Sequence, residues 1–170
     1  MKNKNAFLLA EETVKIIIAV IAISFLAYFL ISLYLTNKTE KDLKFAEASL
    51  EHLIEEINAE VPEVEIYNPE EWDLVSWPYG KILPVSCKNM GWENCLCICN
   101  ALNIGDYAIS LIPSISVYQK TSDKCDKSGF CLEVQDEFIV RGENGKQRPI
   151  NIKSPLKLNI DYETKIISKA

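Results

Sequence analysis

An uninterrupted apolar stretch near the N-terminus constrains the fold of this chain more than any other feature. The 20 residues from Ile16 to Leu35 contain neither a charge nor a proline. At about 1.5 Å of rise per residue, a helix of this length crosses a hydrocarbon core of roughly 30 Å. A cleaved secretory signal is the alternative, but the stretch is long for one and no small-residue cleavage site follows Leu35. We therefore predict a retained transmembrane helix over residues 16–35, with the lipid bilayer as its partner.

The cysteines indicate which side of the membrane each end of the chain occupies. Lysines are balanced on the two sides of the apolar stretch, so loop charge sets no orientation. An even number of cysteines in a small domain beyond a membrane helix is typical of a disulfide framework formed outside the cytoplasm. All of them follow the stretch: Cys87, Cys95, Cys97, Cys99, Cys125 and Cys131. We therefore predict a single-pass cell-membrane protein with a cytoplasmic segment over residues 1–15 and an extracytoplasmic β-rich domain over residues 62–170.

Three of the cysteines alternate along a segment of strand-like composition, Cys95 to Cys99. Side chains two positions apart on a strand share one face, and a bond between such neighbours would distort disulfide geometry. We therefore expect the triplet to bond outward, one member to Cys87 and the other two to Cys125 and Cys131. A local Cys125–Cys131 bond is the competing arrangement, and it would leave the triplet with an internal pair or a free thiol.

Metal binding and redox chemistry are the functional alternatives for these cysteines. Zinc sites favour cysteine pairs separated by two residues, and a thioredoxin-like redox site needs the same C-x-x-C spacing. That spacing does not occur in the sequence. We therefore expect structural disulfides, with no metal and no cofactor.

Beyond the membrane segment, residues 36–61 keep the period of an amphipathic helix. No glycine or proline occurs between Phe7 and Ala59, so one continuous helix is expected, ended by Pro62. Acidic residues occupy the remaining helix surface. The apolar stripe that we expect to pack on the following domain contains Leu43, Ala46, Leu50, Leu53, Ile54 and Ile57.

The C-terminal part of the chain carries β signals, which makes the predicted fold class α+β with a small antiparallel β head. Alternating or short apolar runs bounded by turn residues predict strands. The expected strands are 64–67, 72–77, 95–99, an interrupted strand within 107–118, a hairpin made of 138–141 and 149–152, and 156–162.

The extreme N-terminus has a short basic head, then Ala6, Phe7 and, five positions after the small residue, Glu11. This order resembles the type IV pilin superfamily, including archaeal pilins and the pseudopilins of type II secretion. The resemblance implies a leader of residues 1–6 that a prepilin peptidase removes after Ala6. It also implies that Glu11 pairs with the free amino group of a neighbouring Phe7 while the apolar helices assemble with copies or other pilin-like subunits.

The chain departs from that pattern at several positions. Ala6 replaces the usual glycine, Asn5 stands where a basic residue is common, and Glu12 and Lys15 add charges. The alternative is an uncleaved signal-anchor, in which these charges lie at the cytoplasmic interface and Glu11 and Lys15 form a helical i, i+4 pair.

The remaining polar residues do not form a catalytic constellation in the sequence, and we expect no enzyme. The single histidine, His52, lies on an acidic helix face, where a solvated side chain is expected. Glu70, Glu71 and Asp73 are expected at a strand-edge turn rather than in a paired-carboxylate site. Trp72, Trp77 and Trp92 are expected in the core. No basic patch with interleaved aromatics is present in a chain of net charge −6, so nucleic acid is not an expected partner.

Two functions from different classes remain. The first is a pilin-like structural subunit of a surface filament or secretion machine. The second is a monomeric membrane-anchored surface binding module.

Overall fold

The computed structural model describes residues 4–78, 82–100, 117–142 and 147–170, with side chains from residue 13 onward. The chain forms two compact units, Met1–Lys41 and Asp42–Ala170. A single helix, α1 (Lys4–Asn58), accounts for the described part of the first unit and enters the second. The sequence-based prediction of one long helix is confirmed.

The first unit presents apolar side chains around the whole circumference of α1. The described part of the helix contains a segment long and apolar enough to cross a membrane, and none of that segment is buried. Exposed fractions reach 67% at Phe25 and 72% at Tyr28. A water-soluble helix hides at least one apolar stripe, so this segment has the surface expected of a helix in lipid.

The second unit is organised around the last turns of α1. Ala46, Leu50 and Leu53 are completely buried and Ile57 is nearly so, which confirms the predicted stripe, whereas Leu43 at its start remains 39% exposed. The helix ends in a Schellman motif, because the Val61 amide donates to the Glu56 carbonyl and the Glu60 amide donates to the Ile57 carbonyl. Pro62 follows directly.

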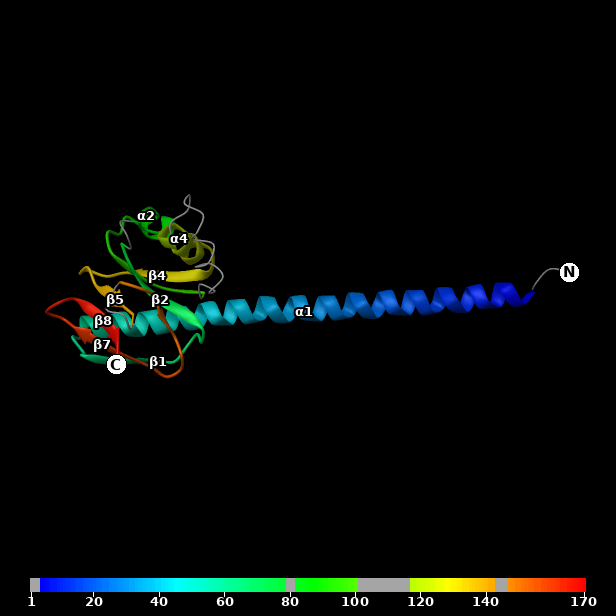
Figure 1. Ribbon diagram of the computed structural model, residues 1–170, viewed down its shortest axis with the longest axis horizontal. Coiled ribbons are helices and arrows are strands. Elements are labelled where there is room, and N and C mark those ends of the chain that lie inside the picture. Colours follow the sequence, from blue (N-terminus) through cyan, green and yellow to red (C-terminus); the bar gives the residue numbers. More distant parts are fainter. Residues whose placement is uncertain (1–3, 79–81, 101–116, 143–146) are drawn as a thin grey trace. The chain divides into compact units, whose positions relative to one another are not determined.

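Two four-stranded sheets pack with α1 (Figure 1). The first has the order β1 (Glu63–Ile66), β7 (Leu156–Asp161), β8 (Ile166–Lys169) and β5 (Ile139–Arg141). The second has the order β4 (Gly129–Glu133), β3 (Cys95–Asn100), β2 (Trp72–Trp77) and β6 (Ile150–Asn151). All pairings are antiparallel except β5 with β8, which is parallel.

The second sheet is buried on both faces, because β2 and β3 lie between two hydrophobic clusters. On one face Leu74, Leu96 and Ile98 join the main core, which also contains the buried residues of α1 and the inner face of the first sheet. On the other face Val75 and Trp77 join a second cluster that contains five buried cysteines. Two helices, α2 (Val85–Asn89) and α4 (Val117–Ser128), cover this cysteine face (Figure 1).

The structure corrects the predicted hairpin of residues 138–141 and 149–152. The chain does turn back there, since Arg141 and Gln147 form an isolated bridge, but β5 pairs with β8 and β6 pairs with β2 in the other sheet. The reason is a contact between the sheets: the buried Ser76 hydroxyl accepts a hydrogen bond from the Val140 amide at 2.8 Å. That contact holds β5 against β2, while β6 pairs with β2 as the edge strand of the second sheet.

Helices α2 and α4 were not predicted. The buried positions of α4 include Thr121, Ser122 and Cys125, which have helical spacing but are not strongly apolar. Hydrophobic periodicity therefore does not reveal this helix. Most of the strand predicted within residues 107–118 lies outside the described residues, and Tyr118 belongs to α4.

Candidate functional site

Strand β3 places its three cysteines on the face that α2 and α4 cover. Cys97 lies directly opposite Cys131 in the β3–β4 register, with 4.1 Å between the Cα atoms, and the two are bonded. Cys95 bonds to Cys87 of α2, and Cys99 bonds to Cys125 of α4. The triplet therefore bonds outward, as predicted, and the competing Cys125–Cys131 bond does not form. No cysteine is free.

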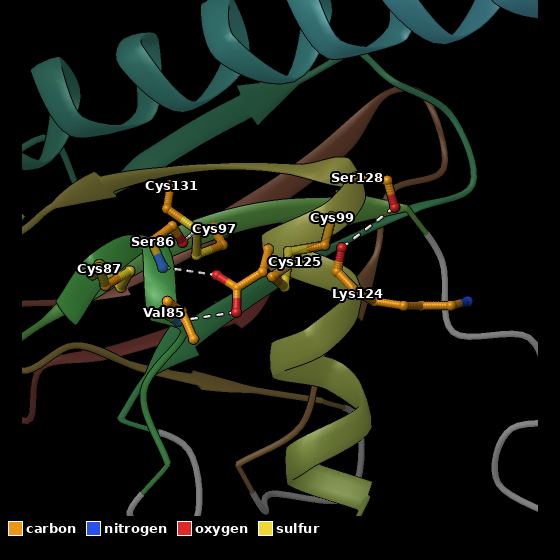
Figure 2. Close-up of a disulfide and its surroundings, with 11 residues drawn as sticks. Val85, Ser86, Cys87, Cys97, Cys99, Lys124, Cys125, Ser128 and Cys131 are labelled. Atoms are coloured by element: carbon orange, nitrogen blue, oxygen red, sulfur yellow. Dashed lines mark hydrogen bonds between the residues drawn. A yellow bond between two sulfur atoms is a disulfide. The ribbon is translucent and has the colours of Figure 1, made fainter. Parts of the chain in front are cut away.

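A carboxylate from α4 holds α2 in position for its disulfide. The N-cap residue of α2 is Pro84, which offers no side-chain hydrogen bond, so the first amides of the helix need other acceptors. The Asp126 carboxylate is the acceptor for two of them: it accepts hydrogen bonds from the Val85 amide at 2.9 Å and from the Ser86 amide at 2.8 Å (Figure 2). A negative charge at a helix N-terminus is also electrostatically favourable.

The three disulfides form one compact sulfur cluster. The sulfurs of Cys87, Cys97 and Cys131 lie within 4.8 Å of one another, and so do those of Cys97, Cys99 and Cys125. Every sulfur is in a disulfide, so none offers the thiolate that a soft metal requires. Cys131 is the only one of the six that is partly exposed, and the others are buried.

Gly129, where α4 meets β4, is fitted tightly against this cluster. A Cβ atom on this residue would lie 2.8 Å from the Cys125 carbonyl oxygen and 3.0 Å from the Cys99 sulfur. Both distances are shorter than normal van der Waals contact, so the close approach of α4, β4 and the Cys99–Cys125 bond requires a residue without a side chain.

The acidic and histidine candidates do not converge. His52 is exposed on α1, with Nδ1 3.8 Å from the Glu56 carboxylate. Glu70 and Glu71 are exposed, whereas Asp73 is buried on β2 and accepts a hydrogen bond from the Asn151 amide at 3.1 Å.

The aromatic candidates are structural. Trp72 and Trp77 are buried, as predicted, and Trp92 is partly buried against the cysteine cluster. The side chains of Ala6, Phe7 and Glu11 lie outside the described residues.

An exposed ion-pair group occupies the outer surface of β1 and β7. The Lys157 ammonium lies 2.8 Å from the Glu65 carboxylate, and the Tyr67 hydroxyl donates a hydrogen bond to the same group at 2.5 Å. Hydrogen bonding to Lys157, and then to Tyr67, holds the pKa of Glu65 below its usual value. The same carboxylate raises the pKa values of Lys157 and Tyr67.

A cationic cleft, which sequence reasoning missed, opens where β6 approaches β8. Its volume is about 260 Å³, and no acidic residue occurs among the described residues that line it. Its cations are Arg148, Lys153 and Lys169, all exposed or partly exposed. They are spread over 22 positions without a motif, and only the pairing of β6 with one sheet and β8 with the other brings them together. The described lining residues are Gly142, Arg148, Pro149, Ile150, Asn151, Lys153 and Lys169.

Comparison of this chain with protein-family models, with curated proteins and with solved structures finds no match in any of the three.

Proposed function

We propose that this protein is a single-pass, membrane-anchored structural subunit whose disulfide-bonded head lies outside the cytoplasm and whose apolar helix assembles with copies or similar subunits in a pilin-like manner. The observation that carries the proposal is α1 itself. Its N-terminal part exposes apolar side chains on all sides, while its C-terminal part, from Ala46 to Ile57, forms the centre of the head. One continuous element therefore serves both as the anchor and as the scaffold of the head.

The disulfides support the proposed side of the membrane. Three bonds without a free cysteine are typical of a domain that folds in an oxidising compartment. With the head outside, residues 1–15 lie in the cytoplasm, where a prepilin peptidase would meet the segment around Ala6.

The state of the N-terminus tests the proposal. Intact mass and N-terminal sequencing of protein extracted from its native membrane should give a mature chain that begins at Phe7. An intact Met1 would contradict pilin-like processing.

Assembly can be tested separately through Glu11. In the proposed filament its carboxylate meets the amino group of a neighbouring Phe7, so Glu11→Gln should leave a folded, membrane-inserted protein that no longer crosslinks through its helices. The matched control is Glu12→Gln, which removes an adjacent carboxylate of the same charge and should retain crosslinking. Equal crosslinking of both variants and the unmodified protein would refute the proposed pairing.

The alternative function is a monomeric membrane-anchored surface binding module. It is favoured by Glu12 and Lys15, which place charges where an assembled apolar helix has none and which suit the cytoplasmic interface of a plain anchor. In that case Glu11→Gln should have almost no effect, because an interfacial i, i+4 pair contributes only about 0.2–0.5 kcal/mol.

A further inference from the structure

Two cations of the cleft, Arg148 and Lys153, have surroundings different from those of Lys157 and Lys165, two paired lysines of the head. Lys157 pairs with Glu65, and Lys165 pairs with Asp136 at 2.6 Å. Within the described parts of the chain, by contrast, the side chains of Arg148 and Lys153 make no hydrogen bond or ion pair. Because the described part of the cleft lining also contains no acid, no described lining residue neutralises the positive charge of these two residues.

The part of α1 that belongs to the same unit carries a row of exposed negative charges instead. Glu47, Glu51 and Glu55 recur every fourth residue, so their carboxylates lie on one face of the helix about 6 Å apart along the axis. All three are exposed, and no lysine or arginine occurs in the sequence between Lys44 and Lys81. Like charges at i, i+4 destabilise a helix unless cations approach them.

From these two surfaces we infer that the cationic cleft of one copy binds the carboxylates of Glu47, Glu51 and Glu55 on α1 of a second copy. The inference rests on the proposed function, because assembly would hold neighbouring copies parallel in one membrane. The surfaces differ from each other, so the contact is heterologous: the cleft of each copy engages the helix of the next, and the contact can repeat. Opposite charges at such an interface set partner register and orientation.

Zero-length carbodiimide crosslinking of the full-length protein in membranes tests the contact, because this reagent joins a lysine to a carboxylate only where they touch. Digestion and mass spectrometry should recover an intermolecular link between Lys153 and Glu51. Raising the salt concentration to screen the charges should reduce its yield.

Charge reversal gives the decisive comparison. Lys153→Glu should lower the yield of crosslinked dimer about tenfold, since attraction becomes repulsion. Lys127→Glu, at an exposed lysine of α4 away from the cleft, should leave the yield unchanged. Coexpression of Lys153→Glu with Glu51→Lys should restore dimers, because the cleft of one variant then matches the helix of the other. The inference would be overturned if Lys153→Glu and Lys127→Glu gave equal dimer yields, or if coexpression did not restore dimers.

A second crosslink separates this inference from the proposed function. The variant Ala27→Cys reports helix-to-helix contact in the membrane, since every native cysteine of the head is already bonded. If this variant forms disulfide-linked dimers while the Lys153–Glu51 link does not form, the helices assemble and the head contact is wrong. If neither crosslink forms, both the assembly and the contact are refuted.

Discussion

The Cys97–Cys131 bond should stabilise the head less than its sequence separation implies, because another disulfide lies inside its loop. Cys97 and Cys131 are 34 residues apart, whereas Cys99 and Cys125 are 26 apart and nested between them. With the inner bond intact, the unfolded chain already holds Cys97 close to Cys131. The path between them is then two residues to Cys99, the inner bond, and six residues from Cys125.

The difference has a calculable size. Chain entropy predicts that closing a 34-residue loop contributes about 3.8 kcal/mol to the free energy of unfolding, whereas closing the path of about eight residues contributes about 2.5 kcal/mol. The cost of removing the outer bond should therefore increase by about 1.3 kcal/mol when the inner bond is absent. The cavities left by alanine at the outer cysteines are similar in both backgrounds and largely cancel from this comparison.

The measurement is urea unfolding of the full chain in detergent micelles, followed by tryptophan fluorescence, because Trp77 is buried within the cysteine cluster. Cys97→Ala with Cys131→Ala is compared in the native background and in the background of Cys99→Ala with Cys125→Ala. The same destabilisation in both backgrounds would refute the argument from nested loops.

Three further predictions concern single residues of the head. Gly129→Ala should lower the free energy of unfolding by about 1–3 kcal/mol in the same urea assay, because its Cβ atom would meet the Cys125 carbonyl oxygen at 2.8 Å. Leu53→Ala should cost about 2–5 kcal/mol, since Leu53 is completely buried, while the exposed Glu51→Ala control should change stability by less than about 0.5 kcal/mol. Lys157→Met should raise the pKa of Glu65 toward its ordinary value in a carboxyl NMR titration. Since the folded state lowers this pKa, the stabilisation from Glu65 is present above the ordinary pKa and is lost as pH falls through the folded value; an unchanged pKa in the variant would show that Lys157 is not the cause.

Local patterns predicted those parts of the fold in which the side chains that pack are also apolar or chemically distinctive. The alternation of Cys95, Cys97 and Cys99 determined both a strand and the outward direction of its disulfides. The spacing of Leu50 and Leu53 likewise predicted the buried face of α1. In each case cysteine or leucine residues recur with the period of the strand or the helix, and these residue types are usually buried.

Features that depend on distant neighbours could not be predicted in this way. The acceptor for the first amides of α2 is Asp126, 40 or 41 residues further along the chain. The cationic cleft depends on which sheet β6 and β8 join, and β6 pairs with β2 of the second sheet rather than with β5, the strand before it in the chain. Tertiary contacts decide such strand pairings, and rules based on turn residues or sequence periodicity do not include those contacts.

The position of the disulfides along the chain also determines how the head would respond to mechanical tension. All three bonds fall between Cys87 and Cys131, so none ties α1 or the C-terminal strands covalently to the rest of the head. A pull transmitted through α1 would be opposed by non-covalent contacts, which include the packing around Leu50 and Leu53 and the hydrogen bond from the Ser49 hydroxyl to the Asn68 carbonyl. The disulfides carry no load until these contacts break. Reducing them would therefore not change the force at which α1 separates from the head. It would instead lengthen the final extension, because oxidised disulfides keep the enclosed loops from unravelling.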